Sequence, residues 1–201
     1  MTTREDKRRQ RNKLIIGLLT IFLMISSVLG IIGYNQQESQ NSVGGINFLQ
    51  KPSNVYGTIW EAKIDGTTYQ FNAHPYQLLS FGMNVSIEPL QNAAQVLLTT
   101  DAPTLTGNHA DFIAAMQYEL ASALQKQGKE VAQGFTNASG YQVQQITCTD
   151  ASDETVVIYS VVGNESIIRL QENCYVMSSA TQTDHFFLKD RLLYALLGVQ
   201  I

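Results

Sequence analysis

The sequence is poor in the residues and motifs that mark catalytic sites. Its 201 residues include two cysteines, three histidines and one tryptophan. No GxSxG, GxxxxGK, GxGxxG, HExxH or CxxC pattern occurs, which excludes the common signatures of serine hydrolases, P-loop proteins, dinucleotide-binding proteins, zinc proteases and zinc ribbons. We therefore expect a protein that is not an enzyme and that uses no cofactor.

Charged residues are absent from residues 14–34, LIIGLLTIFLMISSVLGIIGY. As a helix this run is roughly 31 Å long, the thickness of a bilayer's hydrocarbon core. It predicts one transmembrane helix. The alternative is a cleaved signal peptide, but the run is longer than an ordinary signal peptide's apolar region, and its end, GIIGYNQQ, offers only a weak cleavage site around Val28 and Gly30.

Basic residues are concentrated before this run and absent after it until Lys51. The tail 1–13 contains Arg4, Lys7, Arg8, Arg9, Arg11 and Lys13. Because excess Lys and Arg stay in the cytoplasm, we expect the N-terminus inside and the C-terminal domain outside the cell membrane. A tail that binds nucleic acid or anionic lipid is the alternative. The rest of the chain is acidic, which argues against nucleic acid as a ligand of the domain.

The remaining chain divides into a polar stalk at 35–53 and a domain at 54–201. Ile46, Phe48 and Leu49 interrupt the stalk and indicate either a first edge strand or a docking point on the domain. Strands at 58–64 and 67–71 flank Asp65–Gly66, a two-residue signal of a type I′ hairpin. His74 before Pro75 indicates a turn. A short helix after Pro89 and a buried strand at 95–100 follow.

Two longer helices are predicted from apolar spacing. The first covers 108–127, with Asn108 as N-cap and Gly128 as terminator. Its apolar face contains Phe112, Ile113, Met116, Leu120, Ala123 and Leu124. The second begins at Thr181 or Thr183 and ends near Leu197. Its apolar face is wide, so we expect it to be deeply packed or to contact a partner: Phe186, Leu188, Leu192, Leu193, Leu196, Leu197 and Val199.

Strands at 141–149, 155–162, 166–171 and 174–178 form a predicted β-meander, with a tight turn at Gly163–Asn164. The expected fold is α+β, with two helices packed on an antiparallel sheet. In this meander Cys148 and Cys174 lie near one end of the sheet, on outer strands about 9–10 Å apart by strand spacing. An oxidising compartment then favours one structural disulfide between them. Buried free thiols or metal ligation are the alternatives.

Other side chains suggest modification or chemistry. Asn84, Asn137 and Asn164 each begin an N-x-S sequon at a predicted turn or loop edge, where glycosylation requires exposure. His109, Asp111, Asp184 and His185 stand at two predicted helix starts, and a shared metal or acid–base site would need these starts to converge. Capping and the helix dipole explain the acids without such a site, so no metal site is predicted.

Within the apolar run, Ser26 and Gly30 form a small-xxx-small pair, which lets two transmembrane helices approach closely. Small residues are common in transmembrane helices in any case, so homodimerisation through this pair is one alternative, and a protein partner on the C-terminal helix is another.

Several segments resemble one family: ITCTDAS at 146–152, NES and II around 164–168, NCYVM at 173–177, KDRLLYALLGV at 189–199 and FNAHP at 71–75. The family consists of uncharacterised, single-span, membrane-anchored extracytoplasmic proteins of small-genome archaea. The resemblance implies an N-terminal anchor and an extracytoplasmic domain, and it carries over no catalytic residue.

Three functions are consistent with these features. The first is a non-enzymatic, membrane-tethered domain with a binding or envelope-assembly role. The second is an anchored hydrolase or other metal-dependent enzyme that uses the His and Asp residues. The third is a small subunit of a larger secretion or surface complex, for which the apolar face of the last helix should be partly exposed.

Overall fold

The computed structural model describes residues 41–54, 57–101 and 109–200. The predicted tail 1–13, the predicted membrane helix 14–34 and the Ser26/Gly30 pair lie outside these residues. The chain divides into two compact units, Met1–Ser42 and Val43–Ile201, and nearly all of the described residues belong to the second. Within the described ranges, no helix is both long and apolar enough to cross a membrane.

The first sheet has four strands in the order β1-β2-β3-β4. Their bounds are β1 Ser42–Val43, β2 Ile46–Ser53, β3 Gly57–Ile64 and β4 Thr67–Phe71. β2, β3 and β4 pair antiparallel. The turn between β3 and β4 is the predicted hairpin, and Asp65 and Gly66 both have positive φ angles, 48° and 82°. A type I′ turn requires this backbone conformation.

The predicted boundary between stalk and domain is placed too late in the sequence. Residues 46–53 are not part of a polar stalk, because β2 pairs with β3 along most of its length. Phe48 is fully buried in the core. The apolar interruption at 46–49 is therefore the start of the domain's first long strand, and the polar residues around it face outward.

The second sheet has seven strands in the order β5-β10-β11-β9-β6-β7-β8. Their bounds are β5 Gly82–Met83, β6 Gln95–Thr100, β7 Glu130–Phe135, β8 Gln144–Gln145, β9 Thr155–Val162, β10 Ile167–Gln171 and β11 Cys174–Ser179. β10 and β11 pair antiparallel, and the other neighbours pair parallel. The α+β expectation with an antiparallel sheet thus holds for the first sheet, while the second is mixed and mainly parallel.

The predicted meander is wrong. β9 and β10 are consecutive in sequence, but β11 lies between them and pairs parallel with β9. The turn at Gly163 carries the chain across the end of β11, and the Gly163 N–H donates to the carbonyl of Ser179 at 3.0 Å. Residues 141–149 form only the short β8 and the start of a 3₁₀ turn, η3 Cys148–Asp150. Pairing between strands is set by the whole fold, which local patterns do not disclose.

The predicted helices are confirmed as α2 Glu88–Asn92, α3 His109–Lys126 and α4 Asp184–Leu196. Gly128 follows α3 with a φ of 78°, the left-handed conformation expected of a helix terminator. The predicted apolar residues of α3 lie in or against the core. A 3₁₀ turn, η1 Pro75–Leu78, follows His74, which serves as its N-cap.

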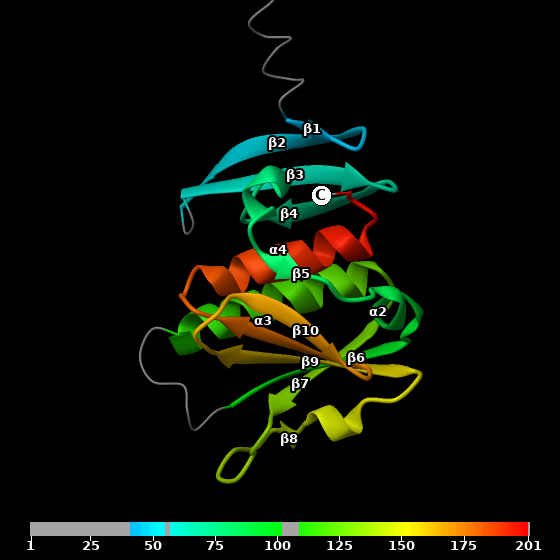
Figure 1. Cartoon of the computed structure of the whole chain (residues 1–201), viewed down its shortest axis with the longest axis vertical. Helices are drawn as coiled ribbons and strands as arrows, with labels where there is room; N and C mark the ends of the chain where they lie inside the picture. Colours follow the sequence, from blue (N-terminus) through cyan, green and yellow to red (C-terminus); the bar gives the residue numbers. More distant parts are fainter. Residues whose placement is uncertain (1–40, 55–56, 102–108, 201) are drawn as a thin grey trace, which may run out of the picture. The chain divides into compact units, whose positions relative to one another are not determined.

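The helices α3 and α4 lie between the two sheets (Figure 1). On one side, the ring of Tyr194 on α4 packs against Phe71 of the four-stranded sheet, with centroids 4.3 Å apart. On the other side, Gln117 of α3 donates to the carbonyl of Thr99 on β6 at 3.1 Å. This placement explains the wide apolar face of α4, since Leu188, Leu192 and Leu193 are buried within the domain itself. The partial exposure expected for a subunit of a larger complex is not observed on these residues.

Candidate functional site

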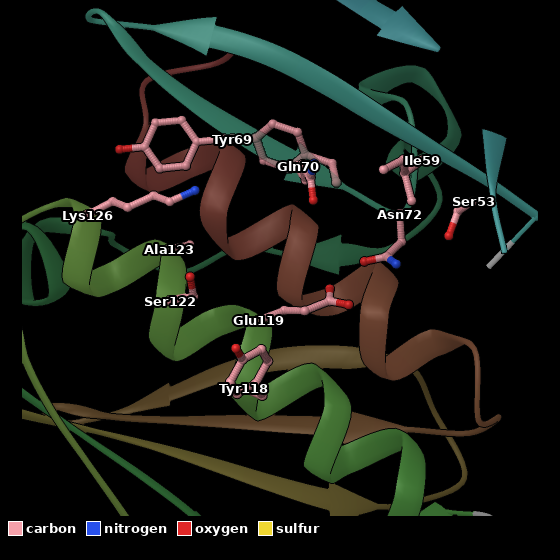
Figure 2. Close-up of a pocket in the computed structure, with 11 residues that line it drawn as sticks. Ser53, Ile59, Tyr69, Gln70, Asn72, Tyr118, Glu119, Ser122, Ala123 and Lys126 are labelled. Atoms are coloured by element: carbon pink, nitrogen blue, oxygen red, sulfur yellow. The ribbon is translucent and has the colours of Figure 1, made fainter. Parts of the chain in front are cut away.

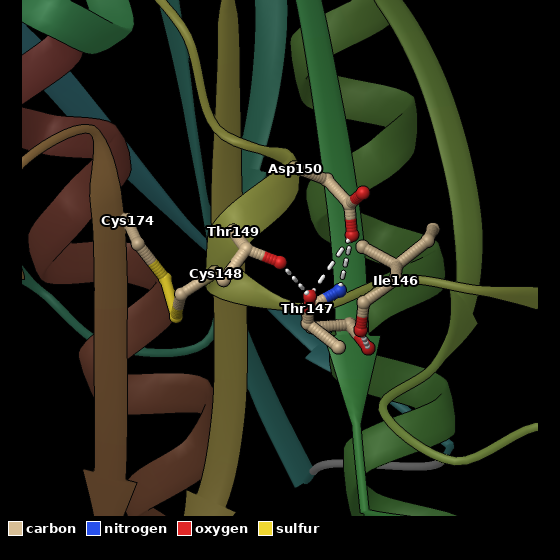
Figure 3. The surroundings of a disulfide bond; sticks show 7 residues. Ile146, Thr147, Cys148, Thr149, Asp150 and Cys174 are labelled. Atoms are coloured by element: carbon tan, nitrogen blue, oxygen red, sulfur yellow. Dashed lines mark hydrogen bonds between the residues drawn. A yellow bond between two sulfur atoms is a disulfide. The ribbon is translucent and has the colours of Figure 1, made fainter.

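The predicted disulfide between Cys148 and Cys174 is confirmed, with Cα atoms 5.4 Å apart (Figure 3). The two residues are not on the outer strands of a meander. Cys148 begins η3 and Cys174 begins β11. Ile146, just before η3, packs with Leu97 and Val157 on the sheet face away from the helices. The disulfide therefore links the segment of Ile146 and η3 covalently to β11, which is a structural role.

The three sequons lie where glycosylation would need them. Asn84, Asn137 and Asn164 are exposed, and each lies outside the helices and strands. Asn137 accepts a hydrogen bond from the backbone N–H of Ser139 at 3.0 Å, within a turn. The geometry permits modification at each asparagine, and the use of these sites stays a prediction.

The structure brings together two of the four residues proposed for a weak catalytic or metal site. Nδ1 of His109 lies 3.3 Å from Nε2 of His185, so the starts of α3 and α4 converge. Asp111 is exposed. Asp184 accepts hydrogen bonds from the Ser166 hydroxyl at 2.5 Å and the Thr181 N–H at 3.1 Å, so it holds the turn that precedes α4.

The histidine pair has the geometry of a hydrogen bond. Its ring centres lie 5.6 Å apart, 2.3 Å more than the nitrogen separation of 3.3 Å. Atoms of a five-membered ring with bonds of about 1.35 Å lie roughly 1.15 Å from its centre, so both nitrogens lie close to the line between the rings. Two nitrogens bound to one metal ion would point at the ion and not at each other. Among the described residues, no group of three or more His, Cys, Asp or Glu side chains is arranged to hold a metal.

His185 is fully buried. Burial, followed by the neighbouring His109, lowers the pKa of His185 to about 4, against an opposing effect from Asp184. His185 is therefore neutral at physiological pH, and one ring of the pair donates its N–H to the other.

A second cluster, the ion network Asp190–Lys189–Glu119, was not predicted from the sequence. The ammonium of Lys189 lies 2.7 Å from Oε2 of Glu119 on α3 and 2.8 Å from Oδ1 of Asp190. It also donates to the side-chain oxygen of Asn72 at 2.8 Å. Lys189 and Asp190 are fully buried, whereas the side chain of Glu119 is 27 % exposed. The network thus runs from the core to the surface and ends at Glu119.

The other oxygen of Asp190 fixes the chain just after β4. Its Oδ2 accepts the backbone N–H groups of Asn72 at 2.6 Å and Ala73 at 2.9 Å. The hydroxyl of Tyr194 donates to the carbonyl of Ala73 at 2.7 Å. The network therefore joins α3 and α4 to the four-stranded sheet, and it also fixes the position of Asn72.

Each charge in this network is supported by its neighbours. Burial alone would lower the pKa of Lys189, but the carboxylates of Asp190 and Glu119 outweigh it and raise that pKa above its usual value. Burial has the largest effect on Asp190 and raises its pKa above the usual value, although Lys189 and the N–H groups of Ala73 and Asn72 act in the opposite direction. The network therefore groups two acidic side chains around one ammonium.

Glu119 forms part of the wall of a pocket between α3 and the four-stranded sheet, here called the α3–β4 pocket (Figure 2). The pocket has a volume of about 220 Å³. Its lining residues come from the ends of β2, β3 and β4 and from one face of α3: Ser53, Ile59, Tyr69, Gln70, Phe71, Asn72, Tyr118, Glu119, Ser122, Ala123 and Lys126. In Figure 2 the carboxylate of Glu119 and the amide of Asn72 are directed toward each other, and Lys126 lies toward the other end of α3.

A second, mainly apolar pocket of about 520 Å³ lies between the starts of α3 and α4. Phe112 and Ala115 line it from α3, and Phe186 and Phe187 line it from α4. Asn72 belongs to the walls of both pockets. Through Asn72 the network is therefore in contact with both of these pockets.

One feature of the sequence does point to the network. Lys189 and Asp190 are adjacent charged residues inside a helix whose other residues are mostly apolar. Charged side chains are rarely buried unless they are paired. A helix as apolar as this one is expected to be buried on most sides, so Lys189 and Asp190 are expected to have partners of opposite charge. The identity of those partners depends on tertiary packing.

Comparison of the chain with protein-family models, with curated proteins and with solved structures finds no match. The resemblance to single-span archaeal proteins therefore stays a prediction. The arguments for function that follow depend on the residues of this chain alone.

Proposed function

We propose that this chain is a membrane-anchored domain outside the cytoplasm that binds a small polar ligand in the α3–β4 pocket. The observation that carries the proposal is the position of Glu119, which is both the exposed end of a buried ion network and part of the pocket wall. At about 220 Å³ the pocket is smaller than the roughly 300–1,000 Å³ of sites for drug-sized ligands. A small ligand suits it.

The ion network holds this wall in place before a ligand arrives. Lys189 fixes the carboxylate of Glu119 and the side chain of Asn72 at 2.7 Å and 2.8 Å. A wall held by buried side chains loses little freedom on binding, and this loss is a main cost of association. Burying an ion pair is itself expensive, and a hydrophobic replacement is often at least as stable. A binding role for the α3–β4 pocket gives a reason for the buried ion network beside it.

Binding is favoured over catalysis by the chemistry of the pocket. Its described lining contains hydroxyls, amides, one carboxylate and one ammonium, and no histidine or cysteine among the residues that the structure describes there. Oε2 of Glu119 is already in contact with the ammonium of Lys189, so this carboxylate is placed as a binding group and not as a free acid or base.

The external location is supported by the uncharged run at 14–34, its basic flank and the disulfide. Disulfides persist in oxidising compartments. External protease added to intact cells that express the full chain tests the location. We expect the domain to be digested while a cytoplasmic marker survives, and protection of the domain until the cells are lysed would reverse the orientation.

A thermal-shift screen of the full chain in detergent tests the binding role, with amino acids, short peptides, polyamines, sugars and organic acids as probes. We expect at least one class to raise the melting temperature of the wild type. The variant Ser122→Phe should lose this response, because the larger side chain fills the pocket. Ser80→Phe is the control, since Ser80 is exposed and lies outside the lining. Equal responses of all three proteins would refute binding in this pocket.

A metal-dependent enzyme is a second candidate function, favoured by one observation: His109 and His185 lie 3.3 Å apart. Isothermal calorimetry with Zn²⁺ tests it. Because the two rings are hydrogen-bonded to each other, we expect the wild type and the variant His185→Gln to give the same heat on addition of Zn²⁺. A stoichiometric signal that this variant abolishes would favour the enzyme over the binding domain.

A further inference from the structure

We infer that the ligand of the α3–β4 pocket is a zwitterion, an amino acid or a short peptide, whose ammonium group binds Glu119 and whose carboxylate binds Lys126. The inference rests on the proposed binding function and names the chemical class of the ligand. It is carried by the placement of two opposite charges along one helix face in one pocket.

The spacing of the two charged residues sets the length of the ligand. Glu119 and Lys126 are seven residues apart on α3, which places them on nearly the same face with a rise of about 10.5 Å. An extended chain spans about 3.3–3.6 Å per residue. Two or three residues therefore reach from one side chain toward the other, and a single amino acid reaches if the flexible side chain of Lys126 bends toward it.

The Glu119 end favours a cation. Lys189 contacts Oε2 of Glu119, and a carboxylate can accept about four hydrogen bonds, so capacity remains for a ligand. The ion network places two acidic side chains around one ammonium, so an incoming ammonium group meets more acceptors than donors there. The exposed ring of Tyr118 lies beside Glu119 in the pocket lining and offers an aromatic surface to the same cation.

The Lys126 end favours an anion. The ammonium of Lys126 donates to the carbonyl of Thr68 at 3.0 Å and lies 5.6 Å from the ring centre of Tyr69. These contacts hold the side chain at its end of the pocket. An ammonium has three donors, so further donors remain for a ligand carboxylate.

The wall between the two charges suits a peptide unit. Gln70, Asn72 and Ser122 supply amide and hydroxyl groups, which can pair with the N–H and C=O of a peptide bond. Tyr69 and Phe71 add aromatic side chains to the same lining. A polyamine would leave Lys126 facing a like charge, and a dicarboxylate would do the same to Glu119, so neither fits both ends.

Calorimetry on the full chain in detergent tests the inference with four probes: L-alanyl-L-alanine, its N-acetyl derivative, its C-terminal amide and putrescine. We expect alanyl-alanine to bind and N-acetylation to weaken binding 10-fold or more, because a hydrogen bond between charged groups contributes about 1.5–3 kcal/mol. Amidation should weaken binding about 3-fold to 10-fold, since Lys126 is exposed to solvent.

Two variants assign each effect to its residue. Glu119→Gln should bind alanyl-alanine and the N-acetyl derivative with equal, weak affinity. Lys126→Gln should bind alanyl-alanine and the amide equally, and it remains informative if Glu119→Gln folds poorly, because Lys126 lies at the surface. Glu130→Gln and Lys63→Gln are the controls, since both residues are exposed and lie outside the pocket. They should bind as the wild type does.

The outcomes separate the two proposals. If the N-acetyl derivative or putrescine binds as tightly as alanyl-alanine and Ser122→Phe abolishes that binding, the pocket is a ligand site and the zwitterion inference is overturned. If none of the probes binds and the wider screen also finds no ligand that Ser122→Phe excludes, both proposals fall.

Discussion

The ammonium of Lys189 lies 2.7 Å from the carboxylate of Glu119, which links a helix buried between two sheets to the wall of a surface pocket. Lys189 is fully buried, donates hydrogen bonds to Asn72 and Glu119, and forms an ion pair with Asp190. The contact joins the stability of the domain to the shape of its proposed binding site.

The variant Lys189→Met should destabilise the domain by about 3–5 kcal/mol, because it leaves the buried carboxylate of Asp190 without a cation. Urea denaturation measures the change. Lys51→Met is the matched control. Lys51 pairs with Glu61 at 2.6 Å, but its side chain is 47 % exposed, so we expect a much smaller loss than for Lys189→Met.

The double variant Lys189→Met/Asp190→Asn should recover part of the lost stability. The amide oxygen that replaces the carboxylate of Asp190 can still accept from the N–H groups of Asn72 and Ala73, and no unpaired charge remains buried at this position. A double variant less stable than Lys189→Met alone would show that the charge of Asp190 is not the cause.

Loss of the disulfide should cost about 3.5 kcal/mol, from the chain-entropy relation for a loop of 26 residues. The variant Cys148→Ala/Cys174→Ala and the wild type are compared by urea unfolding without reductant. The unfolded wild type should also react with no thiol reagent under these conditions. If the thiol reagent labels two cysteines in the unfolded wild type, the disulfide does not form in the cells that express the chain.

Acid should destabilise the domain through His185. Its pKa is about 4 in the folded protein and near 6.5 when unfolded, so the unfolded state takes up the proton first as the pH falls. Stability is complete above pH 6.5 and is lost progressively down to pH 4, by an amount of about 3 kcal/mol.

The control for this pH effect is His185→Phe, which removes the titrating ring and keeps an aromatic side chain in the buried site. Its stability should change less than that of the wild type between pH 7 and pH 4. His109, which faces His185 directly, and Asp184, which lies beside it, are unchanged in this variant. A difference between the two pH profiles therefore reports the ring of His185. Parallel pH profiles would contradict the role of His185.

The parts of the fold predicted from the sequence are those that local chemistry decides. The hairpin at Asp65–Gly66 follows from residues that tolerate positive φ, and α3 follows from its apolar spacing and from Gly128. The sequence does not predict β7, because its six residues include Gly134 and only two side chains that favour strands, Val131 and Phe135. In the structure that glycine is required, since a Cβ there would overlap the carbonyl oxygen of Gln144.

The order of the second sheet was not predictable in this way. The insertion of β11 between β9 and β10 depends on pairings between separate segments, and the sequence of each strand is compatible with several neighbours. The disulfide is predicted correctly although the strand at 141–149 and the pairing of β9, β10 and β11 are not, because its prediction depends mainly on the compartment. The α3–β4 pocket combines strand ends and a helix face, so its residues come together only in the folded chain.

The most direct test of the account is a ¹H–¹⁵N NMR titration of the full chain in detergent with L-alanyl-L-alanine. The account predicts saturable shifts that concentrate on the lining of the α3–β4 pocket, including Asn72, Glu119 and Lys126, and that are lost in Ser122→Phe. Shifts that instead concentrate at the His109–His185 pair, or an unchanged spectrum at saturating peptide, would contradict it.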